Sequence, residues 1–159
     1  MKFRFPIVII DEDFRSENSS GLGIRAMAQA IESEGFEVVG VTSYGDLSQF
    51  AQQQSRASAF ILSIDDEEFT PGPELDPAVL NLRTFIEEVR RKNTEVPIYI
   101  YGETKTSRHL PNDILRELHG FIHMFEDTPE FVARHIIREA KSYLEGIQPP
   151  FFKALLDYA

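Results

Sequence analysis

Apolar residues recur along the chain in two alternating patterns. Short, β-rich apolar runs occupy residues 3–10, 36–41, 58–64, 96–101 and 120–125, and a stretch with helical character follows each run. Strands that are apolar on both sides and alternate with helices predict a parallel sheet covered on both faces. Because the crossovers between parallel strands are right-handed, we predict an α/β, flavodoxin-like (receiver-like), doubly wound sheet with five strands in the order 2-1-3-4-5.

The clearest helical periods lie after the first and third runs. Residues 21–34 are predicted to place apolar side chains from Leu22 to Ile31 on one face, and Gly35 suits the end of that helix. Residues 77–93 repeat the pattern and close on a basic segment, which suits the negative end of a helix dipole. Both stretches are therefore predicted to pack against the sheet.

The last helix has a start signal of its own. Asp127 or Thr128 suits the N-cap, and Pro129 suits the first turn. Phe131 is expected to open the apolar face, and the helix is expected to end before Pro149.

Two shorter helices and one long loop complete the predicted architecture. The helices are expected within residues 44–54 and 110–120, and the loop spans residues 65–77 after the third strand. Its polar, proline-rich composition predicts an irregular surface segment.

Composition narrows the function classes. The 159 residues fit one domain, and 26 acidic against 16 basic residues give a net charge of −10. Such a charge repels phosphate backbones and acidic membranes, so no nucleic-acid or membrane partner is expected. The sequence has no cysteine and no apolar stretch near the roughly 20 residues that span a bilayer. Thiolate chemistry is thereby excluded, and we expect a cytoplasmic protein.

Carboxylates follow two of the predicted strands. Asp11 and Asp13 come after the first strand and Asp65 after the third, so the parallel sheet would gather them at one edge. This arrangement resembles bacterial receiver domains, whose acidic pocket holds Mg²⁺ and a phosphorylatable aspartate. Receivers also place a lysine after the fifth strand, where this chain has Phe125 and Glu126. We therefore interpret the acids as a degenerate pocket of loop residues, with no metal assigned.

Other catalytic motifs do not occur in the sequence. It contains neither a GxxxxGK[ST] phosphate loop nor a GxGxxG turn after a strand, and no GxSxG elbow. The four histidines lack the HExxH spacing of a zinc site. No catalytic or cofactor-binding residue is assigned to this chain.

Three cations lie on or before the predicted fourth helix of this acidic chain. Lys105, Arg108 and Arg116 are candidates for contact with an anionic effector or with a neighbouring subunit. A solvated helix face is the competing interpretation, since isolated exposed ion pairs contribute only about 0–1 kcal/mol.

The final residues, QPPFFKALLDYA, form an apolar tail with a partner-facing set of Phe151, Phe152, Leu155 and Leu156. Together with the segment from Thr106 to Leu144, this tail resembles the N-terminal domain of the bacterial Orn/Lys/Arg decarboxylases.

The resemblance implies a receiver-like domain over residues 1–146, with residues 147–159 beginning a linker helix to a catalytic domain absent from this chain. That domain would carry pyridoxal phosphate and decarboxylate lysine, ornithine or arginine, so the present chain alone is expected to be inactive. It also implies contacts with the chain's own catalytic domain and with neighbouring subunits of a homo-oligomer. The alternative is a free-standing, receiver-like signalling domain with a degenerate phosphoacceptor site.

Overall fold

The computed structural model describes residues 3–43, 57–64, 77–92, 95–102, 110–123 and 126–147. The described elements, in chain order, are β1 (Phe3–Ile10), α1 (Ser19–Ser33), β2 (Phe36–Val41), β3 (Ala59–Ser63), α4 (Pro77–Lys92), β4 (Ile98–Gly102), α6 (Asn112–Leu115), β5 (Gly120–His123) and α7 (Pro129–Ile147). The helix predicted within residues 44–54 and the loop at 65–77 lie outside the described residues.

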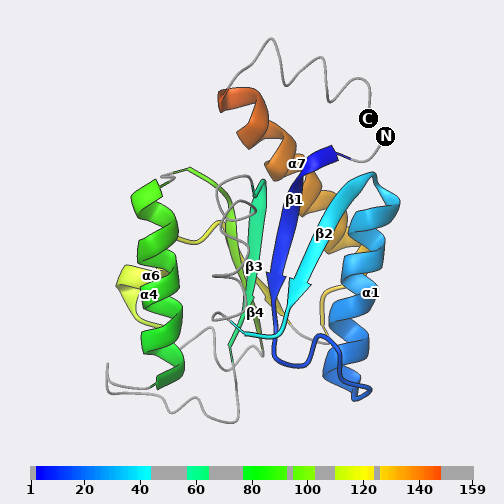
Figure 1. Cartoon of the computed structure of the whole chain (residues 1–159), viewed down its shortest axis with the longest axis horizontal. Coiled ribbons are helices and arrows are strands. Elements are labelled where there is room, and N and C mark those ends of the chain that lie inside the picture. The colour runs from blue at the N-terminus through cyan, green and yellow to red at the C-terminus, as the bar shows by residue number, and fades with distance from the viewer. Residues whose placement is uncertain are drawn as a thin grey trace.

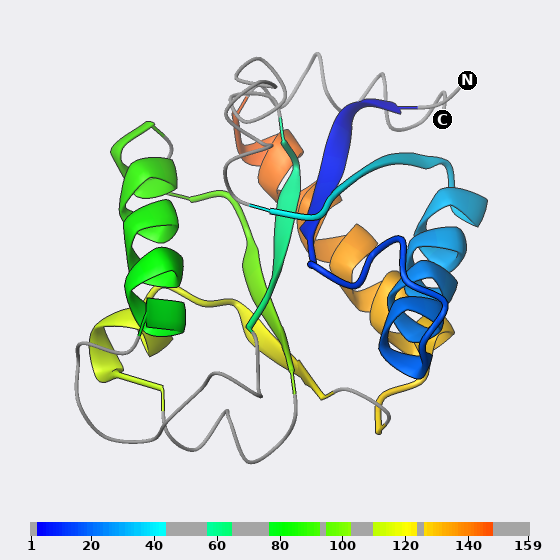
Figure 2. The same ribbon diagram turned by 60° about the horizontal axis from the view of Figure 1, so that its bottom comes forward.

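The five strands form one parallel sheet in the order β2-β1-β3-β4-β5. This confirms the predicted flavodoxin-like topology. Helices α1 and α7 cover one face of the sheet, and α4 with the short α6 covers the other (Figures 1 and 2). No helix in the described part of the chain is long and apolar enough to cross a membrane.

Alternating side chains of each central strand pack in two separate apolar layers, one on each face of the sheet. In β1, Ile7 and Ile9 face α1 and α7, whereas Val8 and Ile10 face α4. All four are at most 2% exposed. Since successive side chains of a strand point to opposite faces, an unbroken apolar run requires cover on both sides of the sheet.

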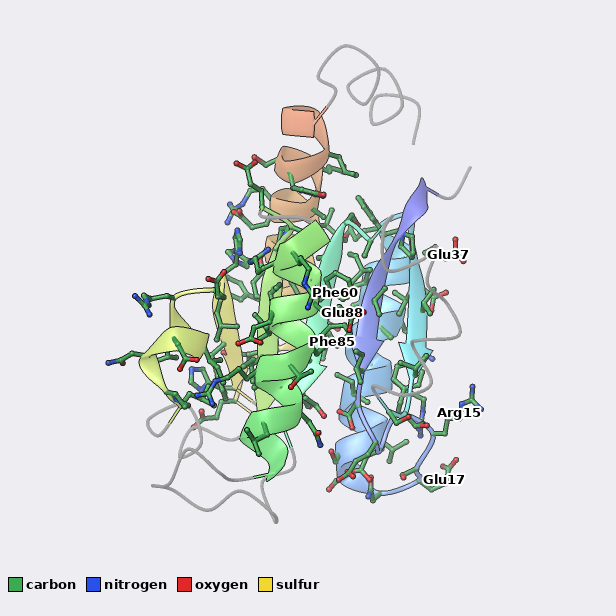
Figure 3. All side chains as sticks on the ribbon, turned by 60° about the vertical axis from the view of Figure 1, so that its left-hand side comes forward. Arg15, Glu17, Glu37, Phe60, Phe85 and Glu88 are labelled. Carbon is green, nitrogen blue, oxygen red and sulfur yellow. The ribbon has the colours of Figure 1, made fainter. Side chains whose placement is uncertain are left out.

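The layer beneath α4 is anchored by aromatic packing. Phe60 of β3 meets Phe85 of α4 in an edge-to-face contact, with 5.6 Å between the ring centroids (Figure 3). Edge-to-face pairs of this kind add about 0.5–1.5 kcal/mol to the stabilisation from burial alone.

The ends of α1 follow local sequence signals. The Asn18 side chain accepts a hydrogen bond from the Gly21 amide at 2.8 Å, which satisfies one of the free donors at the helix start. Gly35 has a positive φ of 99° just beyond the C-cap. Glycine adopts that conformation without steric cost, so the predicted stop is confirmed.

Two residues predicted on apolar helix faces lie on the outside instead. Leu22 is 54% exposed and Phe131 is 66% exposed. At about 100° per residue, Leu22 lies roughly 160° from the buried Ile24, and Phe131 lies roughly 180° from the buried Ala140. The predicted apolar faces were too wide, because they included these two residues although their angular positions point outward.

Arg90 ties the end of α4 to the segments that precede β4 and β5. Its guanidinium donates to the Val96 carbonyl at 2.9 Å, to the Glu117 carbonyl at 2.8 Å and to the Glu117 carboxylate at 2.8 Å. Arg83 makes a two-point contact with the Asp113 carboxylate, at 2.7 and 3.2 Å, in a more exposed position.

We expect Arg90→Ala to lower the free energy of unfolding by about 2 kcal/mol, because it leaves two backbone carbonyls without their donor. Arg83→Ala removes the more exposed contact with the Asp113 carboxylate and should cost at most about 1 kcal/mol. Urea unfolding of both variants measures the difference. Equal losses would show that the backbone contacts of Arg90 contribute nothing beyond the ion pair.

Candidate functional site

Asp11 stands at the carboxyl end of β1, where the sheet was predicted to gather acidic residues. It is 3% exposed, and its amide donates to the Val41 carbonyl of β2 at 3.0 Å. Its Oδ1 accepts a hydrogen bond from the Asp13 amide at 2.8 Å, whereas its Oδ2 has no partner among the described residues. A buried carboxyl oxygen without a donor disfavours the charged form.

The environment of Asp11 changes its titration. Burial raises its pKa to about 6, and the nearby negative charge of Asp13 acts in the same direction. The Asp13 amide and the Ser63 hydroxyl oppose that rise by hydrogen bonding. Burial also raises the pKa of Tyr101 to about 12, with the charge of Asp11 as a second cause. Asp11 is therefore a carboxyl group that can gain a proton under mildly acidic conditions.

Asp13 holds its own loop together. Its Oδ1 accepts hydrogen bonds from the Ser16 hydroxyl and from the Asn18 amide group, both at 3.3 Å. Its carbonyl accepts from the Ser16 amide at 2.9 Å. The second acidic residue of the predicted pocket thus stabilises the connection from β1 to α1.

The same loop is fixed from α1 and from β2. Arg25 donates to the carbonyls of Phe14 and Ser16, at 2.7 and 2.8 Å. The Phe14 ring fills the space above Gly40, which leaves no room there for a Cβ. Arg15 of the same loop extends outward (Figure 3). The loop after β1 is therefore held at several points.

The remaining predicted site residues are only partly described. Asp65, Lys105, Arg108 and the tail set lie outside the described residues, so the roles assigned to them remain predictions. Arg116 lies exposed at the C-cap of α6. Within the described ranges, no group of three or more histidine or carboxylate side chains is arranged to hold a metal ion.

Sequence reasoning missed two parts of this site. Arg25 bonds to the loop eleven and nine residues before it, and no local pattern signals such a contact. Tyr101 approaches Asp11 from a strand distant in sequence. Asn18 could have been found, because an asparagine followed by a helix-like pattern is an N-cap signal.

The family model described as "Orn/Lys/Arg decarboxylase, N-terminal domain" matches residues 19–143. The chain belongs to this family. The fold of the chain agrees with that of a solved family structure, lysine decarboxylase A from Pseudomonas aeruginosa. The two superpose with a TM-score of 0.78 and 26% identity, over 99% of this chain and 21% of that one.

Two curated decarboxylases match this N-terminal domain over almost its whole length. Lysine decarboxylase LdcA of Pseudomonas aeruginosa is 27% identical over 98% of the domain and 20% of its own length. The biodegradative arginine decarboxylase of Escherichia coli K12 is 24% identical over 96% of the domain and 20% of its own length. The domain thus spans about a fifth of these relatives.

Receiver proteins share the fold of the N-terminal domain. An orphan response regulator of H. pylori superposes with a TM-score of 0.57 and 10% identity, over 88% of this domain and 99% of that chain. At this identity the likeness concerns architecture alone. It agrees with the receiver-like topology predicted from the apolar runs.

The described residues do not form a site for pyridoxal phosphate. That cofactor is held through a lysine Schiff base with an acidic partner at its ring nitrogen. Lys141 is the one lysine whose side chain is described, and it lines the outer surface of α7.

Proposed function

We propose that this N-terminal domain is a non-catalytic assembly or regulatory part of a pyridoxal-phosphate-dependent decarboxylase that acts on lysine, ornithine or arginine. The observation that carries the proposal is the match of nearly the whole domain to about a fifth of two curated basic amino-acid decarboxylases. The remaining four fifths of such an enzyme would hold the cofactor and the substrate.

The acidic site supports a structural role rather than a chemical one. Asp13 is engaged with Ser16 and Asn18 of its own loop, and Asp11 is buried beneath the same loop. Carboxylates used in this way position a connection between two elements.

The proposed partners are the catalytic domain of the same polypeptide and neighbouring subunits of a homo-oligomer. Decarboxylase relatives in which this domain is a small part of a larger chain support the first partner. The second partner and the cytoplasmic location remain predictions from the sequence.

Activity measurements on the isolated chain and on the full gene product test the proposal. We expect the 159-residue chain to show neither decarboxylation of the three amino acids nor a pyridoxal absorbance band. The full gene product should show both. Turnover by the isolated chain would contradict the non-catalytic role, and a gene that stops after residue 159 would favour the free-standing signalling domain.

Removal of residues 1–146 from the full gene product tests the assembly role. We expect the shortened enzyme to keep its cofactor absorbance and to form an oligomer of fewer subunits, as judged from its mass in sedimentation. An unchanged number of subunits would contradict a role in assembly and leave regulation as the function of this domain.

A further inference from the structure

An apolar pocket of about 310 Å³ lies between the edge strand β5 and the first turns of α7. The side chains that line it include Tyr99, Ile122, Phe131, Val132, His135 and Ile136. Binding sites for small molecules are concave, mostly apolar hollows that begin at about this size. The pocket therefore has the dimensions and the walls of a site for a small apolar group.

Packed rings fix the shape of the pocket. Tyr99 is 1% exposed, and its ring meets the His135 ring edge to face, with 5.8 Å between the ring centroids. Gly120 of β5 lies opposite Tyr99 of β4, and a Cβ there would stand 3.3 Å from the Tyr99 ring. Phe131 also lines the pocket and is 66% exposed, so its ring stands at the rim.

A carboxylate is the one charged side chain that lines this pocket within the described residues. Asp127 accepts a hydrogen bond from the His123 amide through Oδ2, at 2.8 Å, and no hydrogen bond within the described residues engages its Oδ1. The His135 ring is neutral in this arrangement. Arg138 Nη2 lies 3.2 Å from His135 Nδ1, and because a guanidinium can only donate, that ring nitrogen accepts.

Apolar walls with one negative charge are complementary to an apolar chain that ends in a positive charge. An ammonium group at the rim would be attracted both by the Asp127 carboxylate and by the face of the Phe131 ring. A ligand carboxylate would be repelled by Asp127, in a chain whose net charge is −10. The pocket therefore favours an alkyl amine over an amino acid or an alkyl carboxylate.

The surroundings of the pocket favour a small ligand over a folded protein surface. Next to the pocket, α7 carries exposed or half-buried charges of both signs, at Glu130, Arg134, Arg138 and Glu139. The cores of protein interfaces are depleted of charged residues, and a stable interface covers about 800 Å² of each partner. Here the apolar surface is confined to the pocket and its rim, which suits a ligand of a few carbon atoms.

We propose that the pocket between β5 and α7 binds a free alkyl amine, with its carbon chain against Tyr99 and its ammonium between Asp127 and the Phe131 ring. The identity of the natural amine rests on the proposed function. Decarboxylation of a basic amino acid removes the carboxylate and leaves an apolar stem with cationic ends. The pocket thus distinguishes the product of the proposed reaction from its substrate and makes this domain a sensor of that product.

Titration of the isotope-labelled 159-residue chain, followed by amide signals in NMR spectra, tests the proposal. The probes are pentylamine, 1,5-diaminopentane, lysine and pentanoate. We expect both amines to shift the signals of β5 and of the first turns of α7, more weakly as salt is raised. Lysine should bind about tenfold more weakly than pentylamine, and pentanoate should cause no such shifts.

Matched variants test the two groups assigned to the ammonium. Asp127→Asn keeps an oxygen for the His123 amide but removes the charge, so the affinity for pentylamine should fall about tenfold. Glu130→Gln removes the same charge from a position that does not line the pocket and should change the affinity by less than about twofold. Phe131→Ala should cost about fivefold, whereas Leu22→Ala, which removes an exposed side chain of α1, should have no effect.

Three outcomes would overturn the proposal. The first is the absence of localised shifts with either amine, and the second is an equal loss of affinity in Asp127→Asn and Glu130→Gln, which would indicate general charge attraction. The third concerns the full gene product, in which calorimetry with pentylamine should detect a binding event that Asp127→Asn removes. If that event is missing, the rest of the enzyme occupies the pocket.

The same spectra verify that each variant is folded. Should Asp127→Asn not fold, a comparison of pentylamine with pentanol on the unmodified chain tests the role of the charge, and equal binding would contradict the proposal. Decarboxylation is measured separately on the full gene product. Specific amine binding by the 159-residue chain would support the pocket even if that gene product proved inactive, so failure of the pocket and failure of the proposed function are distinguishable.

Discussion

Gly21→Ala is expected to lower the free energy of unfolding by about 3 kcal/mol, since it overpacks a site bounded by backbone. A Cβ at this position would overlap the carbonyl oxygens of Ser16 and Asp13. Both carbonyls belong to the loop after β1, which Arg25 and the Asn18 cap hold in place. Alanine gains about 1 kcal/mol of helix propensity over glycine, which does not offset the clash. Urea unfolding followed by circular dichroism measures the loss.

Gly146→Ala is the matched control for this prediction. Gly146 lies near the end of α7, and a Cβ added there meets nothing within 4 Å. The substitution should be neutral or stabilise the domain by up to about 1 kcal/mol. If Gly21→Ala proves as harmless as Gly146→Ala, the loop after β1 can move away from α1, and its role as a held connection is wrong.

The second large effect concerns the dependence of stability on pH through Asp11. Its pKa is about 6 in the folded chain against an ordinary value of 3.8, so between these values the native state binds a proton that the unfolded state releases. The resulting stability is present in full below the lower value and is lost as the pH rises through the higher one. We expect a contribution of up to about 3 kcal/mol at low pH.

Asp11→Asn isolates this contribution from the titration of other carboxylates. The amide keeps the oxygen that accepts from the Asp13 amide and carries no charge at any pH. Between about pH 4.5 and pH 7.5, the stability of the variant relative to the unmodified chain should rise by about 2 kcal/mol. Asp13→Asn removes the neighbouring negative charge that helps to raise the pKa of Asp11, so a weaker trend in the same direction is expected. A constant difference between Asp11→Asn and the unmodified chain would mean that Asp11 titrates normally.

The sequence by itself determined the layers and the topology of the sheet. Runs such as residues 3–10 are apolar at successive positions, and a strand of that kind must be covered on both faces. Short connections and right-handed crossovers then leave few strand orders, among which 2-1-3-4-5 is confirmed. Gly35 was predictable as the end of a helix for a local reason, because such an end depends only on the backbone conformation of a few residues. The family was also indicated by the resemblance and is confirmed by the match over residues 19–143.

The tertiary structure alone decided the state of the individual side chains. Asp11 was interpreted as a loop residue of a degenerate pocket, yet it is buried, and burial raises its pKa to about 6. Phe131 was assigned to the core and is exposed beside a pocket. Burial and pKa depend on contacts between segments far apart in sequence, such as Arg25 with its loop or Tyr101 with Asp11. Hydrophobic periodicity reports only the preferences of neighbouring residues, so it predicts the elements and their order but not which atoms meet when they pack.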